Sequence, residues 1–75
     1  MTIAELRIGD NGIVRQIHGN DDCIIRLMEM GLTLGTTVLL NRVAPLGDPL
    51  HLTLRGYHLS IRRSEAARID IDLVS

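Results

Sequence analysis

The chain has 75 residues, of which 45% are hydrophobic and 1% aromatic, and its formal net charge at pH 7 is -1. This length favours one domain, residues 1–75, with a small aliphatic core, and the near-neutral charge with Tyr57 as the single ring disfavours nucleic acid as a partner. The single cysteine excludes an internal disulfide and no long apolar run is present, so we expect a soluble cytoplasmic protein without direct membrane insertion.

The first predicted elements are an apolar lead-in, a turn and a strand. The residues of the lead-in that are expected to plug one end of the core are Ile3, Leu6 and Ile8. Asp10 to Gly12 tolerate left-handed backbone and therefore predict a turn. Apolar and polar residues then alternate from Gly12 to His18, which predicts the first strand.

A short helix is expected next, from Asn20 or Asp21 to about Met30. Either of the first two side chains is able to cap it, and Gly31 is a typical left-handed terminator. Its apolar residues cover more than the stripe, somewhat over about 100° wide, that one packing face needs. These residues are Cys23, Ile24, Ile25, Leu27, Met28 and Met30. We expect Cys23 to be structural, because a thiol in an apolar setting is not activated.

The surplus apolar surface of this helix has two interpretations. In the first, the helix plugs a small barrel, and Ile25 or Met28 is exposed without a function. In the second, the surplus contacts a partner or a second copy of the chain. Flexible methionine side chains suit such a role.

A strand is expected from Thr36 to Val43, and behind it Pro45 and Pro49 bracket a loop with an apolar tip at Leu46. Proline fixes the backbone and so lowers the cost of ordering the loop when it binds a partner. Taken with the helix, the predicted partner-binding residues are Ile25, Met28, Pro45, Leu46, Gly47, Asp48 and Pro49.

The strict alternation of residues 50–63 predicts an antiparallel hairpin. A two-residue turn at Arg55-Gly56 pairs Leu54 with Tyr57, so that the apolar rows of both strands face the core. A helical turn over residues 63–67, capped by Ser64, and a closing strand over residues 69–73 follow. The chain therefore predicts a mainly β fold, a small, partly open barrel of about five strands with one helix after the first strand and a helical turn before the last.

Two histidines of the hairpin are the only metal-ligand candidates. In the predicted register His58 faces Thr53 and His51 faces Ser60, so the imidazoles are diagonal neighbours with Cβ atoms roughly 7–8 Å apart. A closed structural site needs about four ligands. His51 and His58 are therefore weak candidates for Fe2+ or Zn2+, solvated side chains are the simpler interpretation, and no cofactor is expected.

Catalytic motifs are missing from the sequence. It contains no phosphate-binding loop of the Walker type, no dinucleotide fingerprint, and no serine or cysteine in a pattern that pairs it with a base. We therefore expect no enzymatic activity.

Four stretches match a known family: Arg26 to Leu32, Gly35 to Val38, Arg42 to Pro49 and Arg55 to Arg63. Gly9, Gly12 and Val14 near the start and Glu65-Ala66 near the end match it as well. In these residues the chain resembles FeoA, the small accessory protein of bacterial ferrous iron uptake. The run Ala-Pro-Leu-Gly-Asp-Pro within the third stretch is the most specific part. Leu34 departs from the family, which commonly has proline before the turn glycine, and this loosens the connector without changing the fold.

The resemblance implies an SH3-like barrel that acts by protein–protein contact on FeoB, a membrane permease with a cytoplasmic GTPase domain. It leaves open whether the contact regulates GTP hydrolysis, assembly or gating. The alternative is a metal-binding or metal-sensing domain, because the C-terminal domain of DtxR-type repressors is a similar barrel. Self-association through the apolar helix is a further hypothesis.

Overall fold

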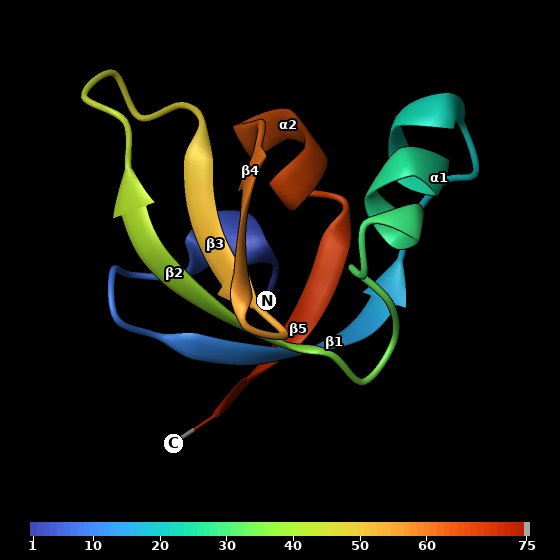
Figure 1. Ribbon diagram of the computed structural model, residues 1–75, viewed down its shortest axis with the longest axis horizontal. Coiled ribbons are helices and arrows are strands. Elements are labelled where there is room, and N and C mark those ends of the chain that lie inside the picture. The colour runs from blue at the N-terminus through green and yellow to red at the C-terminus, as the bar shows by residue number, and fades with distance from the viewer. Residues whose placement is uncertain (75) are drawn as a thin grey trace.

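The computed structural model describes residues 1–74 and consists of one curved sheet of five antiparallel strands with three short helical elements (Figure 1). The strands are β1 (Asn11–Ile17), β2 (Thr37–Val43), β3 (Leu50–Leu54), β4 (Tyr57–Ile61) and β5 (Ile69–Val74). The helical elements are the 3-10 turn η1 (Ile3–Glu5) and the helices α1 (Asp22–Glu29) and α2 (Arg63–Ala66). The predicted mainly β fold, with a helix after the first strand and a helical turn before the last, is confirmed.

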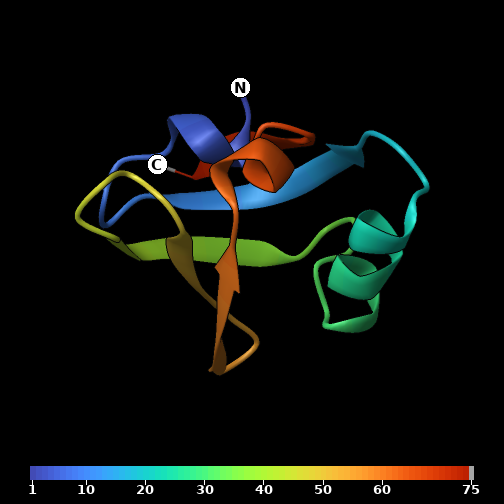
Figure 2. The ribbon, with the colours of Figure 1, turned by 90° about the horizontal axis from the view of Figure 1, so that it is seen from above.

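The sheet has the order β4-β3-β2-β1-β5, and it curls because two of its strands contain a bulge. The register shifts at Arg15 in β1, opposite β5, and at Asn41 in β2, opposite β3. A bulge inserts one residue, bends its strand and increases the twist. Figure 2 shows the result, with β3 and β4 turned steeply against β1 and β2.

The core inside this curl is aliphatic, as the composition predicts. Its buried residues come from every strand and from α1, and they include Ile3, Val14, Ile24, Leu27, Leu40, Leu52, Ile61 and Ile69. Two expectations about the core were wrong. Ile8 is 64% exposed, because it lies at the corner where the chain turns between Arg7 and Asp10. Tyr57 is 38% exposed, because the hairpin tip extends past the barrel and its ring lies against Gly31.

The predicted register of the β3–β4 hairpin is confirmed. Leu54 pairs with Tyr57 across a two-residue turn, in which Arg55 has φ 49° and Gly56 has φ 83°. Positive φ at both turn residues matches the right-handed twist of the flanking strands. The turn thereby sets which side chains of both strands point outward, the two histidines among them.

The helix caps differ from the prediction. Asp21 is the N-cap residue of α1, but its carboxylate bonds to Arg68 and makes no cap hydrogen bond. Ser64 lies inside α2, whose N-cap residue is Arg62. The amide of Arg62 donates to Glu65 Oε1 at 2.8 Å, so a buried glutamate satisfies this helix start from within.

Both edges of the sheet are short. The edge at β5 is covered by the first residues of the chain, since the amide of Ile71 donates to the carbonyl of Met1 at 2.8 Å and Thr2 forms a bridge with Asp70. Within residues 1–74, none of the helices has the length and apolar character that crossing a membrane requires.

Candidate partner-binding site

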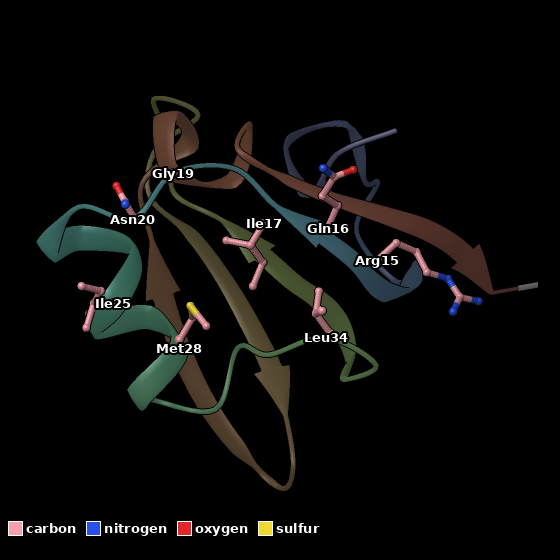
Figure 3. A pocket seen from close by; sticks show the side chains of 8 residues that line it. All are labelled: Arg15, Gln16, Ile17, Gly19, Asn20, Ile25, Met28 and Leu34. Carbon is pink, nitrogen blue, oxygen red and sulfur yellow. The ribbon is translucent and has the colours of Figure 1, made fainter.

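An apolar groove of about 480 Å³ lies between α1, β1 and the connector that follows α1 (Figure 3). The residues that line it are Arg15, Gln16, Ile17, Gly19, Asn20, Ile25, Met28 and Leu34. Figure 3 shows Ile17, Met28 and Leu34 gathered around its centre, whereas the guanidinium of Arg15 points away. Arg15 is paired with Asp72 at 2.6 Å, so the groove itself presents hydrocarbon.

The helix wall of this groove explains the surplus apolar residues of α1. Ile24 and Leu27 are buried and anchor α1 to the core. Ile25 and Met28, one turn apart, form a second stripe on the groove side and are 46% and 43% exposed. The exposure of this stripe agrees with the sequence prediction, whereas its contact with a partner stays a prediction.

Arg68 holds the N-terminal end of α1 against the barrel. Its guanidinium donates to Asp21 Oδ1 at 2.5 Å and to Asp21 Oδ2 at 3.3 Å, and its Nε donates to the carbonyl of His18 at 3.1 Å. The bidentate contact holds the pKa of the Asp21 carboxyl below its ordinary value of 3.8. The helix wall is therefore fixed before any partner arrives.

Replacing Arg68 by Gln is expected to raise the pKa of Asp21 back toward 3.8, which carboxyl NMR titration measures. The folded-state pKa is depressed, so the pair stabilises the fold above the unfolded-state pKa and ceases to do so as pH falls through the folded-state value. The stability difference between wild type and R68Q should therefore shrink in acid. Arg15→Gln, which breaks a different surface pair, is the control and should leave the pKa of Asp21 unchanged.

The connector wall of the groove is held by the hairpin tip. Arg55 Nη2 donates to Thr36 Oγ1 at 3.0 Å and to Thr33 Oγ1 at 3.2 Å, and Thr36 Oγ1 donates to the carbonyl of Gly31 at 3.3 Å. Leu34, within this locked segment, is 65% exposed at the rim of the groove. The hydroxyl and guanidinium contacts thus order a connector that the sequence predicted to be loose.

The loop between β2 and β3 is pinned at its base and exposed at its tip. Arg63 donates from its amide to Asp48 Oδ1, and from Nε to the carbonyl of Gly47, both at 2.9 Å. The Asp48–Pro49 peptide bond is cis, and Pro49 is half-buried. Leu46 is 97% exposed. Asp48 and Pro49 therefore shape the loop, and Leu46 is the side chain that it offers to solvent.

The two parts of the predicted partner-binding surface lie on opposite sides of the molecule (Figure 1 and Figure 2). α1 with Ile25 and Met28 borders β1, whereas Pro45 to Pro49 extend from the far end of β2. One compact partner segment does not reach both. Sequence reasoning also missed the β1 wall of the groove; the signals were Ile17 on the mixed face of the first strand and Leu34 beside Gly35.

The two histidines lie where the register predicted. His51 pairs with Ser60 and His58 with Thr53, and each imidazole Nδ1 lies within hydrogen-bond distance of that hydroxyl, at 2.9 Å and 3.1 Å. Within residues 1–74, His, Cys, Asp and Glu side chains form no cluster of three or more that could hold a metal ion. Metal binding at His51 and His58 stays a prediction.

The model of the FeoA domain family matches residues 1–73. The chain belongs to the FeoA domain family. It is 35% identical over 75 residues to a fusion of Fe(2+) transport protein A with the Fe(2+) transporter FeoB from Porphyromonas gingivalis. The match covers all of this chain and 9% of that fusion, so the FeoA unit is a small part of the relative's length. The resemblance seen in the sequence is confirmed.

Solved FeoA structures share the fold. The FeoA protein of Chlorobium tepidum superposes with a TM-score of 0.94 at 35% identity, over 100% of this chain and 71% of that one. A zinc complex of FeoA from Stenotrophomonas maltophilia, described as a procaryotic SH3 domain protein, gives a TM-score of 0.80 at 32% identity, over 96% and 89%. The SH3-like fold implied by the resemblance is therefore confirmed, and Leu34 in place of the usual proline leaves it intact.

Proposed function

We propose that this FeoA protein is a non-enzymatic accessory of ferrous iron uptake that acts on the cytoplasmic side by direct contact with a FeoB-type permease. The observation that carries the proposal is the Porphyromonas gingivalis fusion, in which the two proteins form one chain. A fusion holds its parts at high effective concentration, which is useful where the separate proteins must meet.

The contact surface that we propose is the groove between α1 and β1. It presents Met28, Ile25 and Leu34 to solvent, and its walls are fixed by Arg68 and Arg55. Anchors of an interface are apolar side chains that fill pockets, and binding is tighter when the site needs no ordering. An apolar side chain of the permease is therefore the occupant that this groove fits.

Binding of the wild-type protein to the cytoplasmic part of the cognate permease tests the proposal. We expect a complex in at least one of the GTP-bound, GDP-bound and nucleotide-free states. Failure to bind in all three would rule out direct contact as the mode of action. The effect of this FeoA on the rate of GTP hydrolysis then separates regulation of the GTPase from a role in assembly.

The loop is a second contact surface that the same assay tests. Leu46→Asp is expected to weaken binding while the fold stays intact, because this side chain is 97% exposed and leaves no cavity. Ile8→Asp changes another solvent-exposed aliphatic side chain, 64% exposed, and serves as the control. Unchanged binding of the Leu46 variant would remove the loop from the contact surface and leave the groove as the site.

Divalent metal binding through His51 and His58 is the second candidate function. The zinc complex of the Stenotrophomonas maltophilia FeoA supports it, since that relative is 32% identical. Calorimetry with zinc or ferrous ion on the wild type and on a His51→Ala, His58→Ala double variant tests it. Equal affinities would exclude these histidines as ligands.

A further inference from the structure

The outer face of β2, β3 and β4 carries hydrogen-bond donors and no carboxylate. These three strands contain no Asp or Glu, although the chain has nine acidic residues. A pocket of about 380 Å³ opens on this face, and its lining residues are Asn41, Arg42, His51 and His58. All four lining residues have polar or charged side chains, and the pocket shares no residue with the apolar groove beside α1.

The bulge in β2 brings two neighbouring side chains to this face. Leu40 pairs with Leu52 and is buried, whereas Arg42 pairs with His51, so Asn41 is the inserted residue. In a regular strand neighbouring residues point to opposite faces, but a bulge re-aims one of them. Asn41 and Arg42 are therefore both exposed on the outer face.

A group of hydrogen-bond contacts orients the ring of His58. Asn41 Nδ2 donates to Thr53 Oγ1, so the Thr53 hydroxyl hydrogen is free to donate to His58 Nδ1 at 3.1 Å. Asn41 Nδ2 also lies 3.3 Å from the same nitrogen. When Nδ1 accepts from the hydroxyl, Nε2 carries the hydrogen of the neutral ring, and in the protonated ring both nitrogens donate.

His51 follows the same arrangement. The Ser60 hydroxyl lies 2.9 Å from its Nδ1, and when this hydroxyl donates, Nε2 carries the hydrogen of the neutral ring. Each ring is able to donate from Nε2 in this tautomer, and a protonated ring donates from both nitrogens. An anion needs hydrogen-bond donors, and both rings supply one.

The positive charge of Arg42 favours a negatively charged ligand in this pocket. It is directly opposite His51, and within residues 1–74 its guanidinium has no hydrogen-bond or ion-pair partner. The acidic residue of the adjoining loop, Asp48, bonds to the amide of Arg63 instead. A fixed positive charge beside two imidazoles repels a cation and attracts an oxyanion, which the guanidinium binds with paired N–H groups.

We propose that Asn41, Arg42, His51 and His58 form an anion-binding pocket for a phosphate-type oxyanion. Arg42 supplies the charge and a bidentate contact, and the Nε2–H groups of the two histidines complete the set of donors. Thr53 and Ser60 position the rings. This proposal is independent of the contact with the permease, because it concerns a different set of residues.

Titration of the 15N-labelled full chain with inorganic phosphate at constant ionic strength tests the pocket. We expect saturable NMR shifts centred on Asn41, Arg42, His51 and His58. Arg42→Gln is expected to weaken binding about tenfold or more, since it removes a charge-assisted pair of hydrogen bonds. Arg7→Gln removes another exposed arginine, which lies outside the pocket, and should bind phosphate as the wild type does.

Three results would overturn the proposal: no saturable shift, equal weakening by the Arg42 and Arg7 variants, or zinc binding at the two histidines that phosphate does not compete with. The amide spectrum of each variant shows directly whether it is folded.

Co-sedimentation with vesicles shows whether the phosphate group that binds belongs to a lipid or to a soluble compound. Arg42-dependent binding to phosphatidylglycerol vesicles, without binding to phosphatidylcholine vesicles, assigns the group to an anionic lipid. Binding of inorganic phosphate without co-sedimentation assigns it to a soluble phosphate compound. Either result supports the pocket.

Discussion

Met28→Asp is expected to weaken binding to the permease by about 2 kcal/mol, or roughly thirtyfold in the dissociation constant. The Met28 side chain is 43% exposed and lies in the groove beside Ile17 and Leu34. A carboxylate there stays hydrated in the free protein but must lose water when an apolar partner side chain enters. Titration calorimetry against the cytoplasmic part of the permease measures the change.

The chain offers a closely matched control for this variant. Met30 is 42% exposed, also lies at the C-terminal end of α1, and does not line the groove. An aspartate at either position meets the same unfavourable helix dipole, at a cost of about 0.3–1 kcal/mol. Met30→Asp should therefore lose similar stability and keep its affinity. Equal loss of affinity in both variants would show that negative charge near the helix end, rather than the groove, is the cause.

Leu52→Ala is expected to lower the free energy of unfolding by about 2–5 kcal/mol, because it removes buried methyl groups and leaves a cavity. Leu52 is fully buried at 0% exposure, in the central row between Leu40 and Leu59. A domain of this size has little stability to spare, so the variant should be partly unfolded near 37 °C. Urea unfolding followed by circular dichroism measures the loss.

The same Leu→Ala substitution at an exposed site separates the effect of burial from the effect of the change in residue type. Leu46 is 97% exposed, and Leu46→Ala should change the unfolding free energy by no more than about 0.5 kcal/mol. A small effect at Leu52, comparable with that at Leu46, would contradict the assignment of the core.

The functional proposals place two surfaces on one small barrel, and the variants separate them. Met28→Asp alters the groove and leaves the outer face of β2, β3 and β4 unchanged, whereas Arg42→Gln does the reverse. A permease contact that tolerates Arg42→Gln and a phosphate site that tolerates Met28→Asp would show that the surfaces act independently.

The spacing of apolar residues was sufficient to predict structure wherever one face of a strand or helix is buried. The alternation around Leu52 and the short Arg55-Gly56 turn determine the hairpin register, because a slip by one residue would turn every apolar side chain outward. The register in turn determines where His51 and His58 lie. The surplus apolar stripe on α1 is equally local, since helical spacing separates Ile25 and Met28 from the buried face.

Contacts between residues far apart in the sequence determine the cap of α1 and the order of the connector that follows it. Such contacts are difficult to predict from the sequence. Asp21 is a good cap by residue type, yet Arg68, 47 positions away, takes its carboxylate. Arg55 locks the connector from 19 positions further along the chain. Such pairs depend on which segments the folded sheet brings together, and no periodicity within one segment encodes that.

By itself the sequence determined the order of the elements, the aliphatic core, the hairpin register and the family to which the chain belongs. Only the tertiary structure decided that the helix and the loop between the prolines lie on opposite sides, that the helix shares a groove with β1 and Leu34, and that a bulge at Asn41 turns Arg42 toward the histidines. The physical reason is that apolar periodicity specifies which face is buried, whereas the curl and bulges of the sheet specify which exposed faces meet.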